Sequence, residues 1–357
     1  LPADDRCLLE ELRRAAPGVT VEQIRAACAD ATRLNGPRIA PSPAELPAAK
    51  AVPGDAPAAS PAEPAQAGPA ADGETAVAAA PAGSVLESPV RRRIDDESLL
   101  WGERFALLPH RPNYLHPLSH ALTTPADPGR ASGDHLQRNE VKFQISFKFP
   151  LTKPLFDGRA ALFFAYTGQS WWQAYNKDRS SPFREYSHEP ELFASWAPGV
   201  QVLGWDWRVA SAGFVHQSNG RSGEFSRSWN RLFADFKFDR PGPWWIGVRP
   251  WLRLREDPKE WPGAARGDDN PDITRYMGHG ELRLGYVGDT HNWTLMMRRS
   301  LSSGGKGAVQ LDYSRPTGIS PQLRWHVQYF DGYGESMIDY QTRVRRIGVG
   351  IMLNDWF

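Results

Sequence analysis

The stretch Val141–Phe149, VKFQISFKF, decides the fold, because apolar and polar side chains alternate along it without interruption. Successive side chains of a β-strand point to opposite faces, so one face of this segment is apolar and the other is polar. The same alternation recurs in four later segments, which span residues 231–238, 246–255, 281–286 and 323–329. A strand that has lipid on one side and a polar interior on the other has this pattern. The sequence therefore predicts an all-β fold, a transmembrane β-barrel.

We expect residues 101–357 to form twelve antiparallel strands, an even number that closes a barrel without an exposed edge. The strands are expected to begin near residues 104, 139, 159, 189, 204, 227, 244, 276, 291, 306, 321 and 343. No run approaches the roughly 18 apolar residues that a membrane helix requires. The tryptophans at 171–172, 205 with 207, and 244–245 are expected in interfacial girdles. A soluble β-sandwich or lipocalin-like barrel is the alternative, since its strands also alternate.

The first hundred residues differ from the rest, because all 14 Trp, 10 Tyr and 16 Phe residues lie after residue 100. Helical periodicity predicts a small helical hairpin in residues 1–40. Residues 41–100 are rich in Pro and Ala and are expected to be a disordered linker. Cys7 and Cys28 lie one in each expected helix, either as a disulfide or as two buried thiols. The chain begins without Met, and we expect that a cleaved secretory signal precedes it.

A histidine, a serine and an asparagine surround one tight turn in residues 214–233, FVHQSNGRSGEFSRSWNRLF. His216 and Ser218 are two residues apart, so on a strand they share a face with Cβ atoms roughly 6.5 to 7 Å apart. Asn219-Gly220 turns the chain, and the returning strand can place Asn230 beside the imidazole. The three residue types provide a nucleophile, a general base and a group that orients the base. The segment therefore predicts a hydrolase site.

The predicted site belongs to the outer wall of the barrel. Asn230 has the parity of Leu232, Ala234, Phe236 and Phe238, which form the apolar face, and the pattern around His216 permits the same orientation. A site on the outer wall at the membrane rim meets acyl chains directly. The substrate is therefore expected to be a lipid.

Longer stretches carry a resemblance to a known family. They are LLPHRPNYL, NEVKFQISFKFPL, SWWQ, SSPFRE, HQSNGRS through SRSWNRL, DDNPDITRYMG, GYGES with IDY, and the terminal GVGIMLNDWF. In these stretches residues 104–357 resemble outer membrane phospholipase A. The resemblance implies a barrel in the bacterial outer membrane that hydrolyses acyl esters of phospholipids and lysophospholipids, requires Ca²⁺ and acts as a homodimer. It also implies that Ser218 is the nucleophile, His216 the base and Asn230 the orienting residue.

The resemblance implies a calcium site at the dimer interface. Its ligands fall on the Arg221 carbonyl and the Ser226 hydroxyl, with the Ser180 carbonyl supplied by the partner. Two positions depart from the family pattern: Gly223 replaces an acidic residue of the calcium-binding turn, and Gly168 replaces a glutamine of the dimer interface. These departures put monomer calcium affinity and dimer strength in question.

Other functions remain open from sequence alone. A non-enzymatic barrel, either a porin or a lipid-binding scaffold, would keep His216, Ser218 and Asn230 as a polar network at the rim. An adaptor would use the N-terminal extension, expected to be periplasmic, to bind a partner while the barrel anchors it. The acidic loop 267–272 has oxygens enough for a cation, but a solvated loop explains it as well. A formal net charge of +1 without an extended basic cluster argues against nucleic acid.

Overall fold

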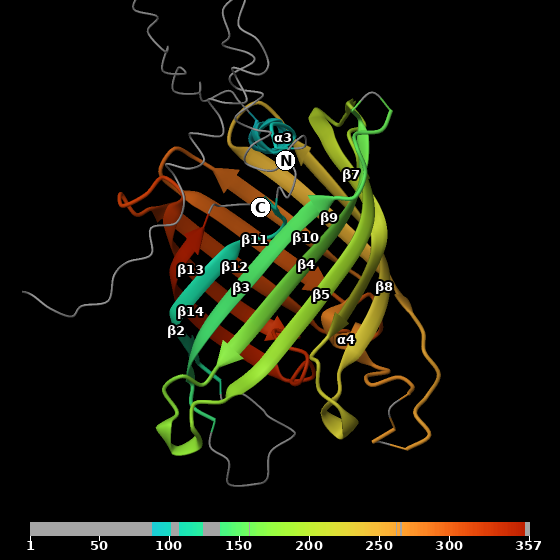
Figure 1. Cartoon of the computed structure of the whole chain (residues 1–357), viewed down its shortest axis with the longest axis vertical. Helices are drawn as coiled ribbons and strands as arrows, with labels where there is room; N and C mark the ends of the chain where they lie inside the picture. The colour runs from blue at the N-terminus through green and yellow to red at the C-terminus, as the bar shows by residue number, and fades with distance from the viewer. Residues whose placement is uncertain are drawn as a thin grey trace, which may run out of the picture. The chain divides into compact units, whose positions relative to one another are not determined.

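The structure is a computed structural model that describes residues 88–100, 107–123, 136–156, 158–261, 263–264 and 266–353. Its main feature is a closed antiparallel barrel of twelve strands (Figure 1). The barrel strands are β2 (Asn113–Ala121), β3 (Asn139–Pro150), β4 (Ala160–Trp172), β5 (Phe183–Trp196), β7 (Trp205–Ser218), β8 (Ser228–Asp239), β9 (Trp244–Leu254), β10 (Gly280–Val287), β11 (Asn292–Arg299), β12 (Gly307–Pro316), β13 (Leu323–Tyr333) and β14 (Arg343–Leu353). The two-residue β1 (Leu108–Pro109) and the three-residue β6 (Val200–Val202) add short pairings to β3 and β7.

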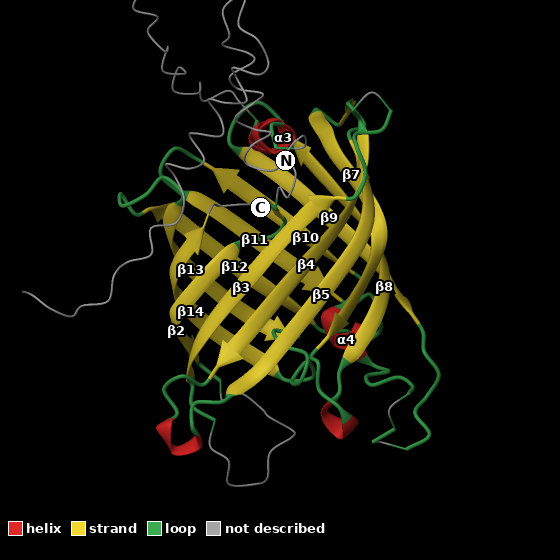
Figure 2. Cartoon of the chain, viewed as in Figure 1, coloured by secondary structure: helices red, strands yellow, loops and turns green. Residues whose placement is uncertain are grey.

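The barrel closes where its last strand meets its first strand, and the first strands are joined in sequence order. β14 pairs with β2, and β3 pairs with β4 along ten residue pairs. All pairings between barrel strands are antiparallel, as predicted, and Figure 2 shows that strands make up the whole wall. No helix in the part of the chain that the structure describes is long and apolar enough to cross a membrane.

Three strands begin four or more residues away from their predicted positions. β10 begins at Gly280 rather than near residue 276, because the short helix α4 (Ile273–Met277) occupies that stretch. The first barrel strand begins at Asn113 rather than near residue 104, because Pro109 and Pro112 lack the backbone N–H that a ladder needs. β5 begins at Phe183, six residues before the predicted 189. The alternation is interrupted at its start, because Arg184 and Glu185 are both buried and Arg184 is the unpaired residue of a bulge in β5, between Phe183, which pairs with Trp172, and Glu185, which pairs with Trp171.

The predicted inside–outside alternation is confirmed. Along β3, Lys142, Gln144 and Ser146 are 2 to 6 % exposed and face the lumen, whereas Ile145 is 56 % exposed on the outer wall. The girdle prediction is wrong for Trp171 and Trp245. Both side chains are buried. Their neighbours Trp172 and Trp244 face the outer wall, and because successive side chains of a strand point to opposite faces, Trp171 and Trp245 point into the lumen. Aromatic residues thus fill the lumen as well as the wall.

Buried charges in the lumen are paired with one another. Arg184 binds Glu140 at 2.7 Å and Asp339 at 3.2 Å, and Arg346 binds Glu140 at 2.8 Å and Glu335 at 2.9 Å. A second group joins Glu191 to Arg111, Arg249 and His110. Pairing offsets the large cost of removing charges from water, so these networks hold strands that are distant in the sequence.

A helix lies at one end of the barrel (Figure 1). This helix, α3 (Pro89–Ser98), begins with Pro89, and the Asp239 carboxylate accepts hydrogen bonds from the N–H groups of Val90 and Arg91. A carboxylate at a helix N-terminus satisfies otherwise unpaired donors. The linker predicted for residues 41–100 must therefore be shortened, because its end is an ordered helix packed on β8 and β9.

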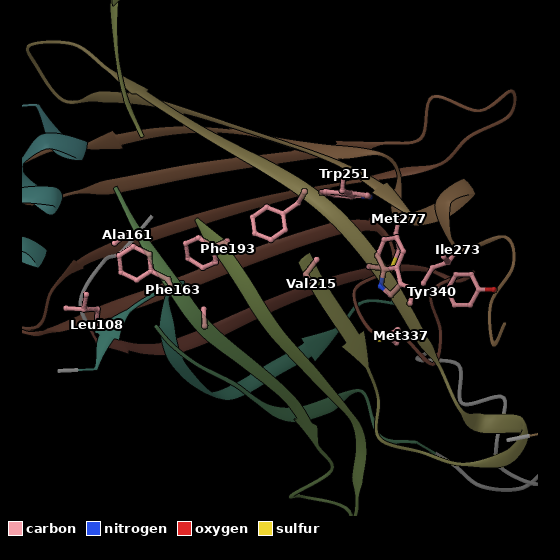
Figure 3. Close-up of a cluster of buried hydrophobic side chains, with 13 residues drawn as sticks. Leu108, Ala161, Phe163, Phe193, Val215, Trp251, Ile273, Met277, Met337 and Tyr340 are labelled. Carbon is pink, nitrogen blue, oxygen red and sulfur yellow. The ribbon is translucent and has the colours of Figure 1, made fainter. Parts of the chain in front are cut away.

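An apolar cluster packs inside the barrel and continues to the Ser218 end (Figure 3). There the short helix α4 (Ile273–Met277) and the β13–β14 loop meet Trp229 and Trp251 from the wall. The cluster consists of Leu108, Ala161, Phe163, Ala165, Phe193, Val215, Trp229, Phe233, Trp251, Ile273, Met277, Met337 and Tyr340. It fixes the ends of β7, β8 and β9, which carry the site.

Predictions for the N-terminal hairpin and the Cys7–Cys28 pair lie outside the described residues.

Candidate active site

His216 and Asn230 meet across the β7–β8 hairpin. The two residues are directly paired in the antiparallel register. His216 Nδ1 lies 2.8 Å from Asn230 Oδ1, which is hydrogen-bonding distance. Side chains that face each other across an antiparallel pair are nearest neighbours, so the fourteen-residue separation predicted from sequence places them in contact.

Ser218 lies at the end of β7, on the same face as His216. Both side chains are half-buried, whereas Val215 and Gln217 between and beside them are buried in the lumen. The site therefore lies on the outer wall, as predicted. Among the described residues no hydrogen bond joins Ser218 Oγ to the imidazole. Such contacts often form fully only with substrate, so the apo arrangement still supports the pair.

A residue that the sequence did not indicate completes the chain of contacts. Asn230 Nδ2 donates a hydrogen bond of 2.9 Å to Glu256 Oε1. Glu256 lies two residues beyond Leu254, which pairs with Asn230 in the β8–β9 register. Because a carboxylate can only accept, this bond turns the Asn230 oxygen toward His216. The strand register provides a signal for Glu256, but only once β9 is known to neighbour β8.

The turn after Ser218 is organised by one asparagine. Asn219 Oδ1 accepts hydrogen bonds from the N–H groups of Arg227 and Arg221, and Asn219 Nδ2 donates to the Phe225 carbonyl. The Arg221 side chain reaches β5, where it binds the Arg184 carbonyl and Glu185. These bonds hold residues 219–227 as one unit beside Ser218.

Two of the three predicted calcium ligands, Arg221 and Ser226, lie in this turn. Ser226 Oγ donates to Asp269 at 2.7 Å, and Ser228 Oγ donates to the same carboxylate oxygen at 3.0 Å. No donor among the described residues engages the Arg221 carbonyl. Ser180 lies in the β4–β5 turn with a left-handed backbone and is exposed. Within one chain nothing that is described brings Ser180 to the other two.

The donor set suits a hard cation. A free carbonyl and a hydroxyl that donates its proton elsewhere both present oxygen lone pairs, the ligands that calcium prefers. Asp269, whose carboxylate accepts the hydrogen bond from the Ser226 hydroxyl, is itself ionised. Burial opposes that charge, but hydrogen bonds from Lys259, Ser226 and Ser228 outweigh it and lower the pKa of Asp269. The residues therefore fit the predicted ion, although Ser180 would have to come from a second copy.

The described residues hold no group of three or more His, Cys, Asp or Glu that could bind a metal. The acidic loop is therefore better described by its ion pairs, Arg253 with Asp268 and Lys259 with Asp269, both at 2.5 Å.

The two glycine substitutions noted in the sequence lie on different parts of the site. Gly223 begins the short helix η2 (Gly223–Phe225) with φ +68°, a backbone that favours glycine. Gly168 faces outward in β4, and a Cβ there would lie 3.2 Å from the Tyr166 ring. Tyr166 donates or accepts a 2.7 Å hydrogen bond with His188, the residue paired with Ser218 across β5 and β7. Next to Gly168, which stands where the family has a glutamine, the outer wall thus carries a hydrogen bond between Tyr166 and His188.

Comparisons with known proteins agree over the barrel. The family model described as Phospholipase A1 matches residues 90–353. Phospholipase A1 of Escherichia coli strain K12 is 38% identical over 262 residues, which is 71% of this chain and 83% of the relative. The putative phospholipase A1 of Neisseria meningitidis serogroup B is 39% identical, over 69% of this chain and 65% of the relative.

Solved structures give the same match. Outer membrane phospholipase A from Escherichia coli superposes with a TM-score of 0.63 at 38% identity and covers 71% of this chain and 100% of that one. A Salmonella typhi outer membrane phospholipase dimer with bound calcium superposes with a TM-score of 0.64 at 36% identity, over 73% and 97% of the two chains.

Proposed function

Because the chain belongs to the phospholipase A1 family, we propose that it hydrolyses the acyl esters of phospholipids and lysophospholipids with Ser218, His216 and Asn230. One observation carries the assignment to this site. The hydrogen-bonded pair His216–Asn230 and Ser218 share the outer wall, where a lipid substrate lies. The exposed apolar side chains of Leu232 and Leu252 lie next to Asn230 along the same face of β8 and β9.

In the proposed mechanism the Ser218 hydroxyl attacks the ester carbonyl while His216 Nε2 takes its proton. Asn230 Oδ1 accepts a hydrogen bond from His216 Nδ1, which leaves Nε2 unprotonated and directed at the serine. The imidazolium then protonates the departing alcohol, and water repeats the sequence to release the fatty acid. The amide gives His216 its orientation without adding a formal charge.

The oxyanion that forms on the ester carbonyl needs preorganised donors. The Ser218 backbone N–H is our proposed donor, because it moves with the nucleophile. The turn 219–227 is held by Asn219 and Arg221, so it can support that position without rearranging. Fixed donors are worth more than flexible ones, since they need no reorganisation during the reaction.

Calcium is the proposed cofactor. The Arg221 carbonyl and the Ser226 hydroxyl would hold it, with the Ser180 carbonyl from a partner subunit. When bound, it supplies positive charge beside the developing oxyanion. Asp269 orients the Ser226 hydroxyl so that its lone pairs remain available.

A homodimer is proposed as the active form. The location of Ser180 away from the turn is the reason, because one chain offers only part of the ligand set. We further propose that the barrel resides in the bacterial outer membrane and that the N-terminal extension is periplasmic. In that orientation α3 lies at the periplasmic end and Ser218 at the outer end of the barrel.

Fatty-acid release from phospholipid in detergent micelles tests the proposal. We expect release by the wild type with calcium, and none by Ser218→Ala or by the wild type with chelator. Release that persists in Ser218→Ala would contradict the nucleophile. Release that needs Ser218 but survives chelation would remove calcium from the proposal. No release by the folded wild type would favour a non-enzymatic barrel, either a porin or a lipid-binding scaffold.

A further inference from the structure

The amide of Asn230 is polarised from both sides. Its oxygen accepts from His216 Nδ1 at 2.8 Å, and its nitrogen donates to Glu256 Oε1 at 2.9 Å. A free asparagine side chain can present either end to the imidazole, because its oxygen and nitrogen have nearly the same shape. In the reversed orientation Nδ2 would face His216 and select the wrong tautomer for a general base. The carboxylate of Glu256 permits only the productive orientation.

The same carboxylate supplies the negative charge that an asparagine side chain lacks. Triads with a carboxylate as third member stabilise the imidazolium by direct charge. An amide offers only a dipole, and the imidazolium that forms during the reaction is then poorly compensated. Here a carboxylate lies one residue further along the hydrogen-bonded chain. Hydrogen bonds in a chain polarise one another, so part of its charge acts through the amide.

Building on the function proposed above, we propose that Glu256 is a positioning residue for this hydrolase, which fixes the Asn230 amide and stabilises the charged form of His216 from outside the triad. It touches neither the serine nor the substrate ester. The site is thus a four-residue relay, Ser218, His216, Asn230 and Glu256, in which the negative charge sits on the fourth member.

The loop after β9 holds Glu256 in place. The Asp257 carbonyl accepts a 2.7 Å hydrogen bond from the Asp268 N–H, and a parallel bridge joins Pro258 to Asp268. Asp268 is in turn bound by Arg253 at the end of β9. Glu256 therefore lies between strand β9, which pairs with Asn230, and a loop that is bonded back to the end of β9. A side chain held from both directions is suited to orienting another.

The first test is the kinetics of Glu256→Gln in phospholipid micelles. Loss of the charge and of the acceptor-only character is expected to lower kcat about tenfold and to leave KM unchanged. Asp257→Asn is the matched control, because it removes a carboxylate from the adjacent, exposed position. The control is expected to match the wild type. A Glu256→Gln variant with unchanged kcat, or with a changed KM alone, would overturn the proposal.

A second test separates positioning from a general structural role. In an Asn230→Asp background the carboxylate of residue 230 contacts His216 directly, and Glu256 becomes a like charge within hydrogen-bonding distance of it. Glu256→Gln should therefore raise kcat in that background, although it lowers kcat in the wild type. The reversed sign is the expected double-mutant result. A decrease or no change in both backgrounds would contradict the relay.

The two proposals fail differently. If Ser218→Ala retains wild-type release, the proposed function fails whatever Glu256 does. If release depends on Ser218 and His216 but the Glu256 effect keeps one sign, the hydrolase stands and the relay is removed. Unfolding midpoints of all variants in micelles, expected to equal that of the wild type, show that kcat is compared among folded proteins.

Discussion

The lumen and the outer wall of this barrel both carry histidine, amide and carboxylate side chains, but they use them differently. In the lumen, His116 is fully buried and contacts His326 at 2.9 Å, and Glu140 is bound by two arginines. On the outer wall, His216, Asn230 and Glu256 are half-buried and form one chain of contacts that ends beside Ser218. The charged groups of the lumen named above are paired with one another, whereas no hydrogen bond among the described residues engages the Ser218 hydroxyl on the wall. We propose that this difference separates residues that stabilise the barrel from residues that take part in catalysis.

The largest expected effect comes from exchanging the same residue type in the two regions. His216→Ala should lower kcat about ten-thousandfold, because it removes the general base. His116→Ala should leave kcat unchanged, since its contacts are inside the barrel. Micelle assays of fatty-acid release measure both. A large loss of kcat in folded His116→Ala would break the distinction between the regions.

The free energy of unfolding should depend on the lumen carboxylate and not on the carboxylate of the outer wall. Glu140→Ala leaves Arg184 and Arg346 without a main partner and should lower the free energy of unfolding by about 3–5 kcal/mol. Glu256→Ala, at the half-exposed rim, should change it little. Urea unfolding in micelles, followed by tryptophan fluorescence, provides the comparison. Equal destabilisation by both variants would mean that the rim carboxylate also supports the fold.

A smaller effect is expected at the orienting residue. Asn230→Ala should lower turnover about tenfold and leave measurable activity, because base and nucleophile persist. Asn113 at the start of β2, an amide away from the site that bonds both the carbonyl and the N–H of Ser146, is the matched control. Asn113→Ala should keep wild-type turnover. A variant at position 230 with full activity would remove the amide from the mechanism.

The smallest effect concerns pH at the turn beside Ser218. Burial would raise the pKa of Asp269, but the bonds from Lys259, Ser226 and Ser228 lower it. A lowered pKa stabilises the folded turn above the unfolded carboxyl's value of about 3.9, and this stabilisation is lost as pH falls through the lower folded value. Amide exchange in residues 219–227, corrected for intrinsic rates, should therefore quicken below about pH 4. Asp269→Asn should abolish that pH dependence, and an unchanged dependence would assign it to another group.

Much of the barrel could be predicted because its signal is local. Strict alternation in segments such as Val141–Phe149 fixes which side chains face outward. His216 and Asn230 do pair, but the connection between their strands spans residues 219–227 and is longer than the predicted tight turn at Asn219-Gly220. The tryptophan prediction failed where aromatic residues fill both faces, as at Trp171 and Trp245. Composition alone does not say which face a large apolar side chain takes.

The parts that sequence missed depend on partners far along the chain. Helix α3 consists mostly of charged residues, and its order comes from Asp239, Lys148 and the barrel mouth, more than fifty residues away. Glu256 lies in a charged loop that follows β9. Its sequence context does not distinguish it from a solvent-exposed carboxylate until β9 is known to pair with β8. In both cases the role depends on a contact with residues far along the chain, and the local sequence pattern does not predict that contact.

The central claim is that the outer-wall serine is the nucleophile activated by His216. Labelling with a fluorophosphonate in micelles, followed by mass spectrometry of the peptides, tests it directly. We expect a single adduct on Ser218 in the wild type and in His116→Ala, and none in His216→Ala. An adduct on another serine, or undiminished labelling of Ser218 without His216, would contradict it.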